Sequence, residues 1–498
     1  MEKRAELVFI PSPLVGHLVS TVEIAKLLLL RHRRLSVTLL LLPLPSSDHS
    51  KAPSYAHSLA SSTPSSVAAR IRFLHLPPLP PPPAAAKPAP SFTPATLSTF
   101  MESYKPAVRD AVSQLGLTGS ESESDPAHLA GFVVDMFCIP MIDVADEFGV
   151  PSYLFFTSGA CALGLALHLQ TLHDELGLDP TELKESDELS IPCFVNPVPA
   201  GVLPSTALDK ENGGATAFIN RARSFRRAKG IMVNTFMELE SHVLQSILQD
   251  YKTKIPTVYP VGPIVNLGNE SSDQAGSTEI MTWLNAQPPL SVVFLCFGSM
   301  GSFGRDQVKE IAGGVENSGY RFLWSLRKPP PKNTHPLPGE YASPPEEILP
   351  EGFIERTAEI GRIIGWAPQV AILSHPSIGG FVSHCGWNST LESVWCGVPI
   401  ATWPMYAEQQ INAFQMVKEL GLSVEITLDY RKDVWKESSR IVSAGDIERG
   451  IRVVMEEDCA IRGKVKEMKE KSRKTLLEGG SAYASLGRFI EDVVSNMP

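Results

Sequence analysis

The chain has 498 residues, of which 43% are hydrophobic and 20% are charged, a composition typical of soluble globular proteins. A formal net charge of −10 argues against a broad nucleic-acid surface, because binding to phosphates needs clustered positive charge. A chain of this length exceeds what one hydrophobic core supports, so we expect two domains.

The amino terminus predicts the first strand, loop and helix of an α/β domain. Residues 6–10 form a short, mostly apolar run that precedes Pro-Ser-Pro, and apolar residues then recur at helical spacing from Val19 to Leu29. The first apolar run is too short for a signal peptide. The basic run 31–34 separates two leucine-rich runs, so neither approaches the ~20 apolar residues of a membrane span. We therefore expect no membrane insertion.

Further buried strands are predicted at 35–42, 70–76 and 131–134, where runs rich in apolar residues resemble strands covered on both faces. Strands that alternate with helices predict a doubly wound parallel sheet in the first half. The proline-rich segment 77–94 has too few backbone N–H donors for a core element. We expect a surface loop there, with a proline-motif ligand for a partner domain as the alternative.

The polar segment 262–279 predicts an interdomain linker. The α/β pattern restarts after it, and strands are expected at 291–297, 321–326, 362–364, 378–383 and 399–402. These elements predict an N-terminal domain at 1–261 and a C-terminal domain at 280–480. A last helix at 481–498 is expected to pack back on the first domain.

Residues 366–409 carry more stacking and hydrogen-bonding groups than folding alone would select. In the middle of this stretch a strand is followed by a turn at His384 and by a helix, with Asn388 or Ser389 as the expected N-cap. Free N–H groups at a helix N-terminus favour an anion such as a phosphate or pyrophosphate. A second glycine-rich turn at 297–302 repeats the arrangement, although many strand-to-helix loops contain such glycines.

The stretch 366–409 closely resembles the plant secondary-product signature of the family 1 UDP-glycosyltransferases. It begins with Trp-Ala-Pro-Gln, contains His-Cys-Gly-Trp-Asn-Ser and ends in Glu-Gln. The resemblance covers essentially the whole chain through PSPLVGHLVSTVEIAKLL near the start, MVNTFMELE at 232–240, YPVGP at 259–263 and EGGSAYASL near the end. It implies two doubly wound Rossmann-like domains that face each other across a cleft, the GT-B type of fold, with the acceptor bound mainly by the first and the UDP-sugar by the second.

The resemblance also implies which residues bind the donor. Trp366 would stack on uracil, and Gln369 and Glu392 would hold the ribose hydroxyls. The other donor-binding residues would be Ala367, then Ser299, His384, Asn388 and Ser389 at the diphosphate, and Trp387, Glu408 and Gln409 at the sugar. This pattern is associated with UDP-glucose, although the family more often has Asp where this chain has Glu408, which leaves another UDP-hexose open.

His17 is the candidate catalytic base, because it follows a strand and a Pro/Gly-containing turn at the start of the first long helix. Asp135 ends another predicted strand and could fix the tautomer of the imidazole, as in the His-Asp dyad of the family. Thr157 is either a helix cap or a contact to the donor sugar. We expect a single displacement with inversion that gives a β-glucoside, and no metal, since no Asp-x-Asp pair is present.

The acceptor class follows from the resemblance alone. The opening motif and DMFCIPMIDVADEFGVPSYLFFTSGA resemble the branch that glucosylates flavonoids, other phenolics and some terpenoids. We expect a flavonoid or related phenolic hydroxyl, with a terpenoid or a hormone as alternatives. The seven scattered cysteines lack metal or disulfide spacing and favour a reducing compartment, so a cytoplasmic location is expected. We also expect a monomer.

Two other classes of protein fit these residues less well. A nicotinamide dehydrogenase should carry G-x-G-x-x-G in its first strand-to-helix turn, where this chain has PSPLVGH. A protein that only binds UDP-sugar or another ligand could dispense with a base, whereas here His17 and Asp135 are both present. Both features favour the transferase.

Overall fold

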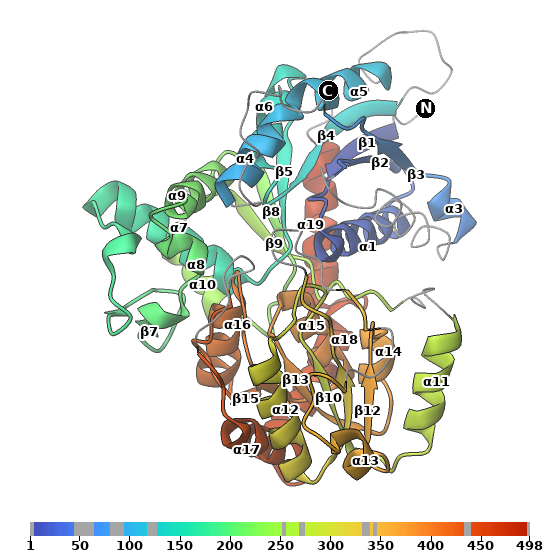
Figure 1. Ribbon diagram of the computed structural model, residues 1–498. Helices are drawn as coiled ribbons and strands as arrows, with labels where there is room; N and C mark the ends of the chain where they lie inside the picture. The colour runs from blue at the N-terminus through green and yellow to red at the C-terminus, as the bar shows by residue number, and fades with distance from the viewer. Residues whose placement is uncertain are drawn as a thin grey trace. The chain divides into compact units, whose positions relative to one another are not determined.

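The computed structural model describes residues 4–43, 64–79, 94–116, 127–250, 255–267, 274–330, 339–341, 346–432 and 440–495. The chain forms two compact units, each assembled from separate stretches of sequence (Figure 1). The first unit comprises 1–182, 206–268 and 474–498, and the second comprises 183–205 and 269–473.

The first unit is built on a seven-stranded sheet in which every strand is parallel to its neighbours. In spatial order the strands are β3 (Ile71–His75), β2 (Leu35–Leu41), β1 (Arg4–Ile10), β4 (Ala127–Asp135), β5 (Ser152–Phe156), β8 (Gly230–Val233) and β9 (Thr257–Pro260). The sequence order reverses between β1 and β4, which is the topological switch point where doubly wound sheets bind ligands.

Helices cover this sheet because their apolar sides join its core. The longer helices are α1 (Val15–Arg31), α4 (Pro94–Ser103), α5 (Lys105–Gln114), α6 (Ile142–Glu147), α7 (Ala160–Leu176), α9 (Gly214–Phe225), α10 (Ser241–Asp250) and α19 (Ser481–Ser495). Leu18 and Val22 of α1 share one apolar core with Phe489 and Val493 of α19. Figure 1 shows α1 and α19 beside this sheet. The last helix of the chain therefore completes the first unit.

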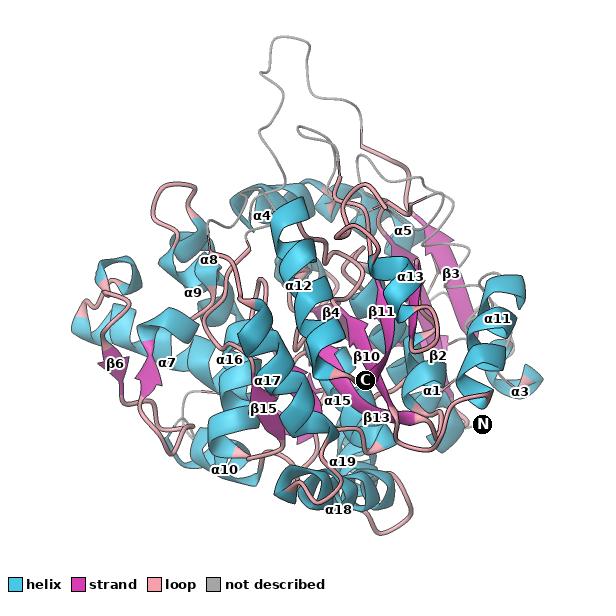
Figure 2. Cartoon of the chain, turned by 60° about the horizontal axis from the view of Figure 1, so that its bottom comes forward, coloured by secondary structure: helices cyan, strands magenta, loops and turns pink. Residues whose placement is uncertain are grey.

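The second unit contains a six-stranded parallel sheet with the same winding. Its spatial order is β12 (Gly361–Ile364), β11 (Arg321–Ser325), β10 (Val292–Cys296), β13 (Ile378–Ser383), β14 (Ile400–Thr402) and β15 (Ser423–Glu425). Its helices include α11 (Gln274–Asn285), α12 (Arg305–Ser318), α14 (Gln369–Leu373), α15 (Trp387–Cys396), α16 (Gln409–Phe414), α17 (Ala444–Met455) and α18 (Ala460–Thr475). Helices α12 and α17 pack side by side (Figure 2). The switch point of this sheet lies between β10 and β13.

Residues 183–205 group with the second unit because their backbone is bonded to it. Arg431 donates hydrogen bonds of 2.7 and 2.6 Å to the carbonyl oxygens of Gly201 and Leu203. The carboxylate of Glu419 accepts hydrogen bonds from the backbone N–H groups of Val195 and Asn196. Charge-assisted contacts of this kind fix an otherwise irregular segment.

The predicted fold class, two doubly wound α/β domains, is confirmed, while several element boundaries differ. Strand β4 begins at Ala127, four residues before the predicted 131, and α11 begins at Gln274, inside the predicted linker. Most of the predicted proline-rich loop, 80–93, lies outside the described residues. The predicted domain ranges stay a prediction. Within the described part of the chain, no helix is long and apolar enough to cross a membrane.

Removing the Phe489 ring should destabilise the first unit. Phe489 is fully buried, and its ring lies 5.0 Å from that of Tyr153 and 5.5 Å from that of Tyr259. We expect Phe489→Ala to lower the free energy of unfolding by about 3–5 kcal/mol, because it leaves a cavity between helix and sheet. Denaturant unfolding measures this loss. Leu30→Ala in the exposed part of α1 is the control, and an equal loss there would contradict the assignment.

Candidate active site

His17 and Asp135 meet at the switch point of the first sheet. His17 lies in the first turn of α1, which follows β1, and Asp135 is the last residue of the neighbouring strand β4. Nδ1 of His17 lies 2.7 Å from Oδ2 of Asp135, whose side chain is fully buried, while that of His17 is 19% exposed. The buried carboxylate therefore selects the tautomer with the proton on Nδ1.

Two further side chains surround this pair. The backbone N–H of Phe137 donates a 2.9 Å hydrogen bond to Oδ1 of Asp135, and the Phe137 ring lies 5.2 Å from the His17 ring. Oγ1 of Thr157 lies 3.0 Å from Nδ1 of His17. Thr157 is not a helix cap, because the N-cap of α7 is Gly159. The carboxylate and its neighbours thus fix the plane of the imidazole.

Glu240, the last residue of the motif MVNTFMELE, supports this corner, although the sequence predicted no role for it. It is 1% exposed, and its two carboxylate oxygens accept 2.8 Å hydrogen bonds from the backbone N–H groups of Ala160 and Cys161. These are the first N–H groups of α7, which an acidic group satisfies and which favour negative charge. Glu240 thereby anchors the helix that begins just after Thr157.

In the second unit, His384 lies between two glycine turns at the switch point between β10 and β13. A Cβ at Gly298 would lie 2.5 Å from Nε2 of His384, and a Cβ at Gly386 would lie 2.6 Å from it. Gly298 has φ +75, a conformation that side chains rarely adopt. The turns after the two strands therefore close on the imidazole because both positions lack a side chain.

His384 is a neutral ring in this setting. Burial lowers the pKa of His384 to about 4, and the backbone carbonyl of Cys296 acts in the opposite direction. An anionic oxygen placed at this ring at neutral pH would therefore accept a hydrogen bond from an uncharged N–H group.

The N-cap of the helix after His384 lies two or three residues earlier than expected. The predicted N-cap at Asn388 or Ser389 is wrong, because α15 begins at Trp387 and Gly386 is its N-cap. Asn388 and Ser389 are instead its second and third residues, and no side chain caps the helix. Because Gly386 offers no side-chain oxygen, the first N–H groups of α15 keep the character of an anion site.

The predicted ribose residues lie together at the start of α14 and on α15. Nε2 of Gln369 donates to Oγ of Ser389 at 2.7 Å and to Oε2 of Glu392 at 2.6 Å. Glu392 is half-buried and belongs to the second turn of α15. An amide that is held by a hydroxyl and a carboxylate presents a fixed set of groups to a diol.

Trp366 lies next to this cluster in the sequence and is 43% exposed. The guanidinium of Arg327 lies 5.3 Å from its ring centroid, and its backbone N–H donates to the carboxylate of Glu340. The following Ala367 is buried. An indole that is held in place and yet exposed can stack on a planar ligand.

The predicted sugar residues have different degrees of burial. Trp387 is 2% exposed, Glu408 is half-buried, and Gln409 is 3% exposed. Oε1 of Gln409 accepts hydrogen bonds of 2.9 and 3.1 Å from the backbone N–H groups of Met405 and Tyr406. The amide oxygen of Gln409 therefore braces the loop that precedes α16.

Asn412 of α16 links that loop to the turn after β13, which contains His384 and Cys385. The sequence did not predict a role for Asn412 either. It is fully buried, and its Nδ2 donates a 3.0 Å hydrogen bond to the carbonyl oxygen of Cys385, a residue with φ 60. A non-glycine residue in this conformation is uncommon and needs support from its surroundings. Ser299, the remaining predicted phosphate residue, lies half-buried in the turn after β10.

Three residues of the site were not predicted. Glu240 and Asn412 bind backbone groups of other residues, and Phe137 contacts both His17 and Asp135. Glu240 and Phe137 lie inside motifs of the family resemblance, but no local pattern indicates their contacts, because the partners of a buried polar group depend on the fold. Among the described residues, no group of three His, Cys, Asp or Glu side chains could hold a metal ion.

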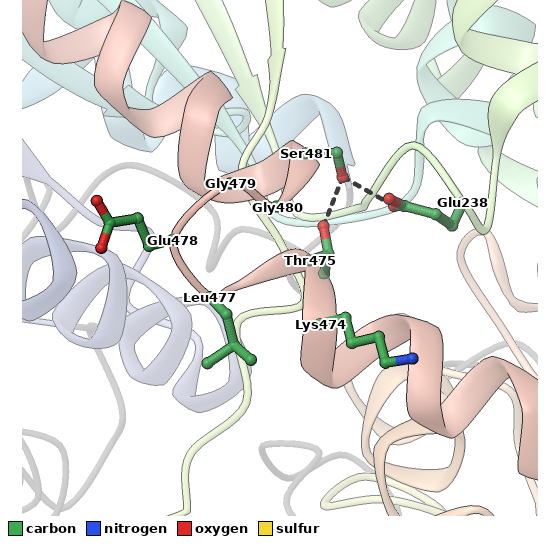
Figure 3. Close-up of a pocket in the computed structure, with 8 residues that line it drawn as sticks. All are labelled: Glu238, Lys474, Thr475, Leu477, Glu478, Gly479, Gly480 and Ser481. Atoms are coloured by element: carbon green, nitrogen blue, oxygen red, sulfur yellow. Dashed lines mark hydrogen bonds between the residues drawn. The ribbon is translucent and has the colours of Figure 1, made fainter.

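An open hollow of about 310 Å³ lies elsewhere in the first unit, where α18 passes into α19. Its lining residues are Glu238, Lys474, Thr475, Leu477, Glu478, Gly479, Gly480 and Ser481. Figure 3 shows the Ser481 hydroxyl between Thr475 and Glu238, to which it is hydrogen-bonded. None of the candidate catalytic or donor-binding residues lines this hollow, so it is separate from the site described above.

Comparison with known proteins identifies relatives along the whole chain. Residues 233–433 match the model of the family described as "UDP-glucoronosyl and UDP-glucosyl transferase". UDP-glycosyltransferase 71A15 of Malus domestica is 54% identical over 99% of this chain and 100% of its own. UDP-glucose flavonoid 3-O-glucosyltransferase 6 of Fragaria ananassa is also 54% identical, over 99% of each chain.

A solved structure shows the same architecture. The Medicago truncatula protein UGT71G1, crystallised with UDP-glucose, superposes with a TM-score of 0.83 at 40% identity, covering 99% of this chain and 98% of the other.

Proposed function

Because the chain belongs to the family of UDP-glucuronosyl and UDP-glucosyl transferases, we propose that it transfers glucose from UDP-glucose to a hydroxyl of a flavonoid or related phenolic, with inversion to a β-glucoside. The observation that carries the proposal is the hydrogen bond between His17 and the buried Asp135 at the switch point of the first sheet.

His17 acts as the general base in this proposal. Its Nε2 accepts the proton of the acceptor hydroxyl, the oxygen forms a bond to the anomeric carbon, and the bond between that carbon and the diphosphate oxygen breaks. The charge on Asp135 stabilises the imidazolium that forms. Thr157 helps to hold the imidazole ring of His17 and also contacts the donor sugar.

The second unit binds the donor. Trp366 stacks on uracil beside Ala367, and Gln369 and Glu392 hold the ribose. The diphosphate lies at the start of α15 against His384, Asn388, Ser389 and Ser299, and Trp387, Glu408 and Gln409 contact the glucose. The uncapped helix N-terminus and the neutral imidazole support this assignment, since both stabilise the charge that develops on the leaving UDP.

The relatives support the choice of substrates. One is named for transfer from UDP-glucose to the 3-hydroxyl of flavonoids, and the Medicago truncatula structure contains UDP-glucose. The seven cysteines are all free, six of them buried, which supports a reducing compartment. We propose that the protein is a monomer located in the cytoplasm.

Incubation of the wild-type protein with UDP-glucose and a panel of flavonols tests the proposed reaction. We expect mass spectrometry to show addition of one hexose, and the coupling constant of the anomeric proton to show a β-linkage. Phenolic acids, terpenoids and other UDP-hexoses in the same panel define the preference. Transfer to terpenoids only, or an α-linked product, would contradict the proposal.

Replacement of His17 should abolish transfer without loss of donor binding. We expect His17→Ala to lower kcat by about 10²–10⁴-fold, because the acceptor loses its base. UDP release during turnover measures the rate. His173→Ala is the matched control, since Nδ1 of His173 lies 2.8 Å from Asp174 in a similar pair whose histidine is 45% exposed. Retained turnover in His17→Ala would exclude His17 as the base.

A methyl group at Gly298 should weaken donor binding. In Gly298→Ala the Cβ would collide with the His384 ring, so we expect the Kd for UDP to rise at least about tenfold, a change that corresponds to ~1.4 kcal/mol. Gly319→Ala is the control, because Gly319 has φ +72 and a Cβ at this position would meet nothing within 4 Å. Calorimetric titration with UDP compares the two. Equal weakening in both variants would mean that backbone strain, and not His384, is responsible.

A further inference from the structure

Four arginines lie close together on and just after α9, in the sequence Arg-Ala-Arg-Ser-Phe-Arg-Arg at 221–227. Three of them bind oxygen atoms on neighbouring helices: Arg223 binds Asp174, Arg226 binds Gln170 and Thr171, and Arg227 binds Asp143 and Asp146. These contacts anchor α9 to α7 and α6. They account for three of the four guanidinium groups.

Arg221 is different. Its guanidinium lies 4.5 Å from the centroid of the Phe137 ring, and among the described residues no oxygen accepts a hydrogen bond from it. Its side chain is partly buried. Burial lowers the pKa of Arg221 to about 10, and the charge of Asp135 opposes this change, so the group stays cationic at neutral pH.

Packing against Phe137 does not use the hydrogen-bonding capacity of this cation. A cation–π contact involves the flat face of the guanidinium. The five N–H donors lie in the plane of the group and point away from its face. Donors that are partly removed from water without a partner carry a free-energy cost, and a ligand that supplies an oxygen would offset it.

The position of Arg221 places these donors near the proposed reaction centre. The Phe137 ring contacts both the Arg221 guanidinium and the His17 imidazole, whose centroid is 5.2 Å from that of Phe137. The distance from Cζ of Arg221 to the centroid of the His17 ring therefore cannot exceed the sum of 4.5 and 5.2 Å. This separation is comparable with the length of an aromatic acceptor that carries oxygen groups at both ends.

We infer that Arg221 determines acceptor specificity by binding an anionic oxygen, a carboxylate or an ionised phenol, on the part of the acceptor remote from the reacting hydroxyl. This inference rests on the proposed function, since it takes His17 as the base. A guanidinium suits such a group because it combines a fixed charge with paired donors that match a carboxylate.

Binding of matched probes tests the role of Arg221 without relying on turnover. Titration calorimetry with UDP present measures the affinities for 4-hydroxycinnamate and for its methyl ester, which lacks the charge. We expect the wild-type protein to bind the acid at least about tenfold more tightly than the ester, because hydrogen bonds to a charged group usually change the affinity by this factor or more. In Arg221→Met the ratio should fall to about one, and Arg221→Lys should retain part of it.

Two controls separate this effect from misfolding. The affinity for the ester should change little in Arg221→Met, since the ester offers no charge to the guanidinium. Arg223→Met removes a cation from the same helix, and it should leave the acid-to-ester ratio unchanged because that side chain binds Asp174. Equal affinity of the wild-type protein for both probes, no binding of the acid, or an unchanged ratio in Arg221→Met would overturn the inference.

A second pair of probes distinguishes the two kinds of anion. Kaempferol and its 4′-methyl ether differ in one ionisable phenol, and a wild-type preference for kaempferol that Arg221→Met abolishes would extend the role of Arg221 to phenolates. A preference confined to the acid would assign it to carboxylates. If no flavonol is glucosylated while the acid-to-ester ratio behaves as expected, the proposed acceptor class fails and the role of Arg221 stands.

Discussion

Adjacent parallel strands whose connections leave on opposite faces of a sheet open a gap at their carboxyl ends, and both candidate sites of this protein depend on that constraint. In the first unit the gap lies between β1 and β4, and it brings His17 to Asp135. In the second unit it lies between β10 and β13, and it brings the Gly298 turn to His384. One topological rule thus positions the proposed base in one unit and the proposed anion site in the other.

Buried polar groups then convert these gaps into fixed geometry. Glu240 neutralises the start of α7, and Asn412 and Gln409 hold the backbone around Cys385 and the loop before α16. Each of these groups is nearly or fully inaccessible, so its hydrogen bonds do not compete with water and tolerate little displacement. The side chains expected to meet the substrates therefore rest on a layer of buried hydrogen-bonding groups.

Much of the fold could be predicted from the sequence because the signals were local, whereas most of the candidate donor-binding residues came from the family resemblance. Apolar runs marked β1, β2 and β10, and glycines beside His384 marked a strand-to-helix turn. The N-cap of α15 was misplaced because Gly386 gives no polar signal, although it occupies the cap. The roles of Glu240 and Asn412 and the ring contact of Phe137 with His17 could not be found, since they follow from contacts with residues far away in the sequence. The grouping of 183–205 with the second unit has the same cause.

The first unit takes its strands from the beginning of the chain and its closing helix from the very end. During synthesis all strands of the first sheet leave the ribosome before most of the second unit. The rings of Tyr153 and Tyr259, however, can pack against the Phe489 ring only after α19 has emerged. Domains generally fold as they are made, with the N-terminal one first. Here the order is inverted: the unit that starts first finishes last, and the nascent protein carries an incompletely covered apolar sheet face throughout the synthesis of its partner unit.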